Sequence, residues 1–103
     1  MSIVRVTKKN YMVEILESEQ PVLLDFWADW CGPCQMITPI ISQIAEERPD
    51  IKVCKVNVDA EPELAEEFMV TNIPALFLIK EGEVIGQMIG ARPKEQILDF
   101  INQ

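Results

Sequence analysis

The chain contains a run at positions 22–28, Val-Leu-Leu-Asp-Phe-Trp-Ala, in which a single charge interrupts an apolar sequence. A near-continuous apolar run of this length is typical of a β-strand covered on both faces, as in parallel and mixed sheets. Residues 51–58 form a second such run, and residues 75–79 and 84–89 have the pattern of two strands joined by a connection of hairpin length. A short β-branched run at residues 2–6 adds a first strand. These runs predict a central sheet buried between two outer layers.

Segments between and after these runs carry apolar residues at the spacing of an α-helix. Thr7 can cap the first of these helices, and Pro62 and Pro93 stand where the first turn of a helix tolerates proline. The apolar faces are expected to comprise Tyr11, Met12, Ile15 and Leu16 in the first helix, Met36, Ile37, Ile40, Ile41 and Ile44 in the second, Leu64, Ala65 and Phe68 in the third, and Ile97, Leu98 and Ile101 in the last.

The predicted order of elements is therefore β-α-β-α-β-α-β-β-α. Because strands and helices alternate, right-handed crossovers should place helices on both faces of the sheet, and the late hairpin adds an antiparallel edge. We predict an α/β fold, a three-layer sandwich with a central mixed five-stranded sheet flanked by four helices. At 103 residues the chain is expected to be a single domain, residues 1–103.

Composition argues against several classes of function. The net charge of −8 disfavours non-specific nucleic-acid binding. The chain has no histidine, which removes Cys-His and Ser-His nucleophilic catalysis and every histidine-containing metal site. No apolar run approaches the length of a membrane span, and residues 1–5 lack the basic segment and apolar stretch of a secretory signal. We therefore expect a cytoplasmic protein that binds neither membranes nor nucleic acid.

Two cysteines, Cys31 and Cys34, lie between the buried strand at 22–28 and the start of the second helix. In a strand-loop-helix unit the first cysteine sits at the helix N-terminus, where unpaired N–H groups and the helix dipole favour a thiolate. The second sulfur follows about one helical turn later, close enough to close a small disulfide. We expect an exposed, nucleophilic Cys31 and a more buried Cys34 that resolves the mixed disulfide.

Half of a zinc site is the alternative interpretation of this pair. Structural zinc usually needs four cysteine or histidine ligands, and the sequence has no second pair. Cys54 is the one further cysteine, and it lies inside the apolar run 51–58, where it is better interpreted as a small core residue. Redox chemistry at Cys31 and Cys34 is therefore favoured, with no metal site.

The segment 25–34, Asp-Phe-Trp-Ala-Asp-Trp-Cys-Gly-Pro-Cys, resembles the thioredoxin signature over its whole length. The resemblance extends from the first helix to the last. It implies the thioredoxin fold and a protein disulfide reductase whose redox group is its own Cys31–Cys34 dithiol, with Gly32 and Pro33 between the sulfurs and no other cofactor. It also implies disulfide-containing client proteins and a thioredoxin reductase as partners. The chain is expected to act as a monomer.

Asp25 and Lys55 are charges inside two strands that should be covered on both faces. A charge in such a position is expensive unless it is paired or neutralised, so a salt bridge or a strand end at the solvent would each explain it. The functional interpretation makes Asp25 a proton acceptor beneath the dithiol. The resemblance places a buried aspartate and a lysine at the matching positions of thioredoxins and implies that Lys55 tunes Asp25.

Ile73 and Pro74 precede the strand predicted at 75–79. From residue chemistry alone, a cis bond at an X-Pro pair has a frequency of only ~5%. The resemblance, however, implies that this is the cis-proline that packs beside the dithiol and presents the Ile73 backbone to an extended client peptide. It also places Gly90 and Ala91 in a second loop of the substrate groove, where Gly90 permits close backbone approach. Further residues of this apolar patch are expected to be Trp30, Gly32 and Pro33.

The direction of the reaction is expected to be reduction of clients. Pro33 fixes φ and offers no N–H to a thiolate, and oxidase- and isomerase-like relatives often carry histidine there. Gln35 stands where many relatives have lysine and Ala75 where threonine is common, which leaves the redox potential and the range of partners open. Three alternatives remain: a thiol oxidase or isomerase of the same fold, a non-catalytic accessory subunit, and a zinc-binding module.

Overall fold

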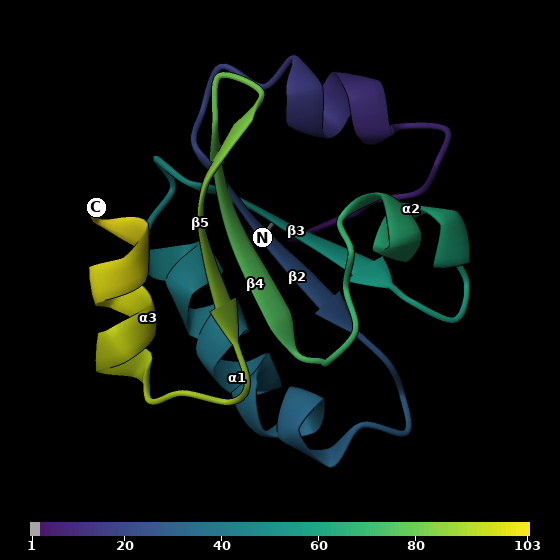
Figure 1. Ribbon diagram of the computed structural model, residues 1–103. Coiled ribbons are helices and arrows are strands. Elements are labelled where there is room, and N and C mark those ends of the chain that lie inside the picture. The colour runs from purple at the N-terminus through teal and green to yellow at the C-terminus, as the bar shows by residue number, and fades with distance from the viewer. Residues whose placement is uncertain (1–2) are drawn as a thin grey trace.

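The computed structural model describes residues 3–103 and contains one five-stranded sheet with the strand order β1-β3-β2-β4-β5 (Figure 1). The strands are β1 (Ile3–Arg5), β2 (Val22–Trp27), β3 (Lys52–Asn57), β4 (Ala75–Lys80) and β5 (Glu83–Ile89). The pairs β1–β3 and β2–β3 are parallel, whereas β4 runs antiparallel to both β2 and β5. The predicted mixed sheet with an antiparallel hairpin is therefore confirmed, although the start of the predicted first strand, at Ser2, lies outside the described residues.

Helices cover both faces of this sheet, as expected for a three-layer sandwich (Figure 1). The four helical segments are η1 (Met12–Leu16), α1 (Gly32–Glu47), α2 (Pro62–Glu67) and α3 (Lys94–Ile101). One core layer joins Ile15 of η1 and Leu64 of α2 to the sheet. The other joins α1 and α3 to its opposite face, and Phe100 adds to the predicted apolar stripe of α3. No helix among residues 3–103 is long and apolar enough to cross a membrane.

The central strand β2 contributes side chains to both core layers. Val22, Leu24 and Phe26 belong to the layer under η1 and α2, and Leu23 belongs to the layer under α1 and α3. Successive side chains of a strand point to opposite faces, so Asp25 shares the face of Leu23. The carboxyl group therefore lies in the layer covered by α1, the helix that follows the dithiol.

The first helical segment differs from its prediction. It is a short π-helical segment, closed by a bond from Glu17 N to Met12 O, rather than an amphipathic α-helix. Because i→i+5 bonding changes the angle between successive side chains, the 3.6-residue spacing no longer describes one face. Ile15 is buried as expected, but Met12 and Leu16 are exposed, so their assignment to the core is wrong.

Met36 was also wrongly expected in the core, since 69% of it is exposed. It lies four residues after Gly32 and three after Pro33 on α1, and residues at these spacings share one side of a helix. Gly32 and Pro33 are themselves exposed, so this side of α1 faces away from the sheet. Met36 therefore extends the surface around the dithiol rather than the core.

The hairpin between β4 and β5 turns through Glu81 and Gly82, which both have positive φ, 52° and 80°. A two-residue connection of this kind matches the twist of the strands it joins. A Cβ atom at Gly82 would also lie 3.2 Å from the Leu16 carbonyl oxygen. The hairpin that composition and spacing predicted is therefore confirmed, with glycine required at its second turn position.

Candidate active site

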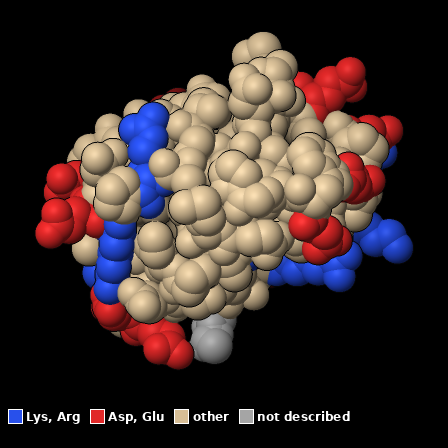
Figure 2. All heavy atoms as spheres, turned by 90° about the horizontal axis from the view of Figure 1, so that it is seen from below, with Lys and Arg blue, Asp and Glu red and all other residues tan. Residues whose placement is uncertain are grey.

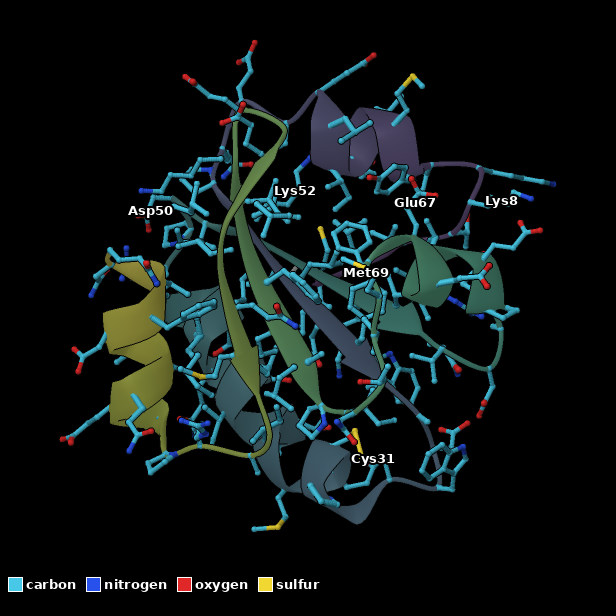
Figure 3. The ribbon with its side chains drawn as sticks, viewed as in Figure 1. Lys8, Cys31, Asp50, Lys52, Glu67 and Met69 are labelled. Carbon is cyan, nitrogen blue, oxygen red and sulfur yellow. A yellow bond between two sulfur atoms is a disulfide. The ribbon has the colours of Figure 1, made fainter. Side chains whose placement is uncertain are left out.

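Cys31 is the N-cap residue of α1, directly after β2 and its short connecting loop. Its Sγ accepts a hydrogen bond from the Cys34 backbone N–H at 3.1 Å, and the two cysteines form a disulfide with their Cα atoms 5.3 Å apart. Figure 3 shows this sulfur pair at the end of the sheet where α1 begins. The helix N-terminus thus directs N–H groups and the positive end of its dipole at the sulfur of Cys31, which stabilises a thiolate there.

Both sulfurs are enclosed in this disulfide form. Cys31 is 4% exposed and Cys34 2%, so the expected exposure of Cys31 is wrong here. The reason is a small apolar cluster at the end of the sheet, in which Ala28 and the partly buried Trp27, Val58 and Ile73 pack around the two cysteines. Most of the surface of both sulfurs is therefore covered by neighbouring side chains in the disulfide form.

Ile73–Pro74 is a cis peptide bond, as the resemblance to thioredoxins implied. The Ile73 carbonyl oxygen lies 3.8 Å from Cys31 Sγ. The Pro74 carbonyl accepts a hydrogen bond of 2.8 Å from Gly90 N, which joins the loop after β5 to the loop before β4. The loop before β4 therefore contacts Cys31 through Ile73 and contacts the loop after β5 through Pro74.

Gly90 is needed for its backbone angle rather than for close approach. Its φ is +95°, a region that residues with a Cβ atom rarely adopt, whereas an added Cβ would meet nothing within 4 Å. Within the chain itself the backbone angle is therefore the reason for glycine at this position, and the close approach of a client stays a prediction. Ala91 beside it is half-buried against the core layer of α1 and α3.

The rim of the site is mostly uncharged. Trp30 is 71% exposed, and Gly32, Pro33 and Met36 are exposed beside it along the start of α1. Figure 2, which looks at this end of the molecule, shows uncharged residues across the centre and charged side chains toward the margins.

Asp59 is a site residue that the sequence interpretation missed. Its Oδ2 accepts a hydrogen bond of 2.9 Å from Trp30 Nε1, and its own N–H donates to Asn57 Oδ1 at 2.9 Å. These bonds fix the orientation of an otherwise exposed indole. The sequence could have indicated this residue, because Asp59 comes two residues after the end of β3. The carboxyl ends of parallel strands such as β2 and β3 lie at the same edge of a sheet, so residues after them lie close together.

Asp25 is buried beneath this end of the sheet. It is 2% exposed, and its Oδ1 has no hydrogen-bond partner. Burial raises the pKa of Asp25 from 3.8 to about 6, while the positive charge of Lys55 acts in the opposite direction. A carboxyl group with this pKa can both release and accept a proton near neutral pH.

Lys55 is the direct neighbour of Asp25 across the β2–β3 pair, but the two form no salt bridge within the described part of the chain. Its Nζ instead lies over the indole of Trp27, 5.3 Å from the ring centroid. Lys55 also lines a cleft of about 370 Å³ with Arg5, Asp29 and other residues at the edge of β1. Its charge therefore acts on Asp25 through space from a partly solvated position, and the salt-bridge interpretation is wrong.

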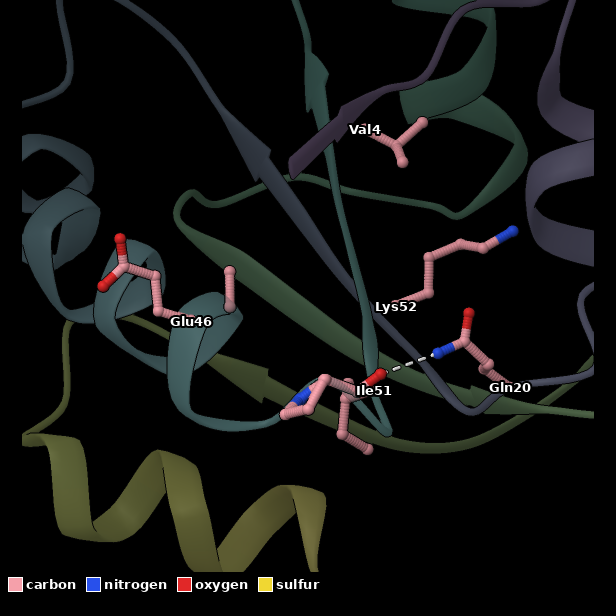
Figure 4. Close-up of a pocket in the computed structure, with 7 residues that line it drawn as sticks. Val4, Gln20, Glu46, Ile51 and Lys52 are labelled. Atoms are coloured by element: carbon pink, nitrogen blue, oxygen red, sulfur yellow. Dashed lines mark hydrogen bonds between the residues drawn. The ribbon is translucent and has the colours of Figure 1, made fainter. Parts of the chain in front are cut away.

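Other candidate features lie away from the dithiol. Cys54 is fully buried in β3, and burial raises the pKa of its thiol to about 12, as expected for a core residue. Residues 3–103 contain no cluster of cysteine and carboxylate side chains able to hold a metal ion. A cleft of about 480 Å³ (Figure 4) is lined by Gln20 and Lys52 among others and crossed by the bond from Gln20 Nε2 to the Pro49 carbonyl. It lies at the starts of β2 and β3, opposite the edge that carries Cys31.

Comparison with known proteins agrees with this geometry. The sequence profile named Thioredoxin matches residues 2–103. A thioredoxin from Rickettsia felis is 46% identical over 99 residues, which cover 95% of this chain and 94% of that protein. Thioredoxins from Pyropia yezoensis and Mycobacterium bovis are 42% and 44% identical, over 100% and 92% of this chain and 97% and 83% of their own lengths. With the Cys31–Cys34 disulfide at a helix N-terminus, these matches show thiol-disulfide redox chemistry, and the chain belongs to the thioredoxin family of protein-disulfide oxidoreductases.

Proposed function

We propose that this chain reduces disulfide bonds in client proteins, with Cys31 as nucleophile and Cys34 as resolving thiol. The observation that carries this proposal is the position of Cys31, which caps α1 through the Cys34 N–H and lies 3.8 Å from the carbonyl of the cis-proline loop. The N–H bond and the helix dipole favour the Cys31 thiolate after reduction. The adjacent Ile73 backbone offers an edge along which an extended client segment can pair.

The reaction is a pair of thiol-disulfide exchanges. The Cys31 thiolate attacks one sulfur of the client disulfide, the client S–S bond breaks, and the other client sulfur leaves as a thiolate that takes up a proton. Cys34 loses its proton and attacks Cys31 Sγ, so the mixed disulfide breaks and the second client thiolate takes up a proton. The client gains two electrons and two protons, and the chain is left with its Cys31–Cys34 disulfide.

Asp25 is proposed to accept the proton of Cys34, directly or through water, with Lys55 tuning it. Three observations support this role: the carboxyl is buried on the face covered by α1, its Oδ1 is unpartnered, and its pKa is raised to about 6. A base whose pKa is close to the working pH is suited to proton transfer in both directions. Trp30, Gly32, Pro33, Ile73, Pro74, Gly90 and Ala91 are proposed to form the surface that receives the client.

Pro33 supports the reducing direction, because it offers no N–H to a thiolate of the helix terminus. We propose that a thioredoxin reductase returns the chain to the dithiol form and that the chain carries electrons as a monomeric cytoplasmic protein. A thiol oxidase or isomerase is the second candidate, and no contact among the described residues favours it. A role as accessory subunit would require an activity that survives removal of both sulfurs.

The reduction potential of the Cys31/Cys34 couple tests the proposal. We would measure it by equilibrium titration against glutathione and dithiothreitol, with Cys31→Ser as the inactive control and Cys54→Ser as the matched control that keeps the dithiol. A potential well below that of glutathione would support a disulfide reductase. A potential near or above that of glutathione would favour the oxidase or isomerase, and the absence of a two-electron couple would refute redox function.

A further inference from the structure

Arg92 follows directly on the Gly90–Ala91 loop and is exposed. Its Nη2 donates to the Ile89 carbonyl oxygen at 3.0 Å and its Nη1 to Gln96 Oε1 at 3.5 Å. Both acceptors are neutral, and together they hold the guanidinium against the end of β5. The side chain is therefore partly pre-organised, and several of its five N–H donors remain free.

The charge of Arg92 is not cancelled by a carboxylate within the described residues. Four other cations form salt bridges, namely Lys8 with Glu63, Arg48 with Asp50, Lys52 with Glu14 and Lys94 with Glu47. Arg92 belongs to none of these pairs, although the chain as a whole carries a net charge of −8. An exposed, oriented and unpaired guanidinium can bind an incoming carboxylate without first breaking an internal ion pair.

A short series of contacts connects Arg92 to the dithiol. Cys31 Sγ lies 3.8 Å from the carbonyl oxygen of Ile73. The carbonyl oxygen of the next residue, Pro74, accepts a hydrogen bond of 2.8 Å from Gly90 N, and Arg92 comes two residues after Gly90. Two residues span at most about 7 Å, and an extended client advances about 3.3 Å per residue. If a client segment with its cysteine at Cys31 follows this path, a residue about two to four positions away comes next to Arg92.

We propose that Arg92 is a specificity-determining residue that selects clients with an acidic side chain about two to four residues from the reacting cysteine. This inference rests on the proposed function, because it requires the client to lie along Ile73 and the Gly90–Ala91 loop. The centre of this face is mostly uncharged (Figure 2), and the carboxylate of Asp59 lies beside Trp30. Arg92 thus adds a position-dependent preference to a surface that otherwise tolerates many sequences.

The test uses short peptides whose single central cysteine is disulfide-linked to neutral 2-mercaptoethanol. Glutamate or glutamine is placed at each position in turn, and kcat/KM for reduction is measured with the full-length protein and with Arg92→Gln. The measured quantity is the glutamate-to-glutamine ratio of kcat/KM in the parent divided by the same ratio in the variant. This double ratio isolates Arg92 from the general repulsion that a net charge of −8 exerts on every acidic peptide.

We expect a double ratio of about 1.5 to 5 at one or two positions and close to 1 at the others, as for an exposed ion pair. The effect should weaken as salt is added, and Arg92→Lys should keep part of it. Lys80→Gln is the matched control, because it also removes one positive charge but lies at the far end of β4. At about 3.3 Å per residue, Lys80 is roughly 17 Å from Ala75, the residue of β4 that follows Pro74. Its double ratio should stay near 1 at every position.

A double ratio near 1 at every position for Arg92→Gln, or equal effects of Arg92→Gln and Lys80→Gln, would overturn the inference. If the parent reduces the glutamine peptides normally in that case, the proposed function stands and only the role of Arg92 fails. If no peptide disulfide is reduced at all, the proposed function fails and this inference fails with it.

Discussion

Replacing Asp25 with asparagine should stabilise the protein at neutral pH and slow its reaction with clients. The carboxyl is 2% exposed, its Oδ1 lacks a partner, and burial raises its pKa from 3.8 to about 6 despite the opposing effect of Lys55. Because the folded state then binds this proton more tightly than the unfolded state, the free energy of unfolding falls as the pH rises through this interval. Stability contributed by the protonated carboxyl is complete below about pH 3.8 and is lost above about pH 6.

The size of this loss follows from the two pKa values. At about 1.4 kcal/mol per pH unit, the rise from 3.8 to about 6 corresponds to about 3 kcal/mol at neutral pH. Asparagine has nearly the same shape and carries no charge, so it avoids this cost. The free energies of unfolding of Asp25→Asn and the parent should therefore coincide near pH ~3.5 and differ by about 3 kcal/mol at pH ~7.5.

Urea unfolding of the oxidised protein over a range of pH values measures this difference. Asp29→Asn is the matched control, because it removes one negative charge from an exposed position near the dithiol. Stopped-flow measurement of client release should show a slower attack by Cys34 in Asp25→Asn. A variant that is less stable than the parent at neutral pH and reacts with unchanged kinetics would refute both parts of the reasoning.

Three further changes test the rest of the site. Lys55→Gln should raise the pKa of Asp25 above about 6, because it removes a positive charge that lowers this pKa. NMR titration of the Asp25 carboxyl measures the change, and a lower pKa would contradict the through-space effect of Lys55. Asp59→Ala removes the hydrogen bond that orients the Trp30 ring, so it should shift the indole N–H resonance of Trp30 and raise KM for protein disulfides more than it lowers kcat. An unchanged resonance would argue against that hydrogen bond. Gly90→Ala should lower the free energy of unfolding by roughly 1–2 kcal/mol, because the φ of Gly90 is +95°. Gly32→Ala, whose added Cβ would meet nothing within 4 Å, should change the free energy of unfolding by less than about 0.5 kcal/mol. Equal effects of the two substitutions would contradict the backbone argument.

Much of the fold could be predicted because the strands of this protein are covered on both faces. Such strands appear in the sequence as apolar runs, and β2 and β4 match their predicted ranges closely. The hairpin was predictable for another reason: Gly82 lies in the short connection between two strand-like runs, and the turn there needs positive φ. The position of Cys31 at the start of α1 followed from the order strand, loop and helix.

Features that depend on contacts between distant segments could not be predicted in the same way. The π-helical geometry of η1 changes which of its residues are buried, and the 3.6-residue rule gives no warning of it. The burial of Cys31 depends on Ile73, which lies 42 residues further along the chain. From residue chemistry alone the cis bond before Pro74 was improbable, and only the resemblance to thioredoxins predicted it.

The electrostatics of Asp25 were predictable in direction but not in arrangement. Burial in a doubly covered strand favours the neutral carboxyl, and the pKa of Asp25 is raised to about 6 although Lys55 acts against the rise. The choice between a salt bridge and longer-range attraction depended on where the flexible Lys55 side chain lies. Its position over the Trp27 ring is a property of tertiary packing that no local pattern encodes.

The buried thiol of Cys54 gives the protein a built-in reporter of its own unfolding. In the oxidised form Cys54 is the one cysteine outside the disulfide, it lies in a strand with neighbours on both sides, and its pKa is raised to about 12. An alkylating reagent can therefore modify the oxidised chain only when the sheet opens. The labelling rate, compared with that of an unfolded thiol, then gives the free energy of opening in the absence of denaturant, as native-state hydrogen exchange does for amides.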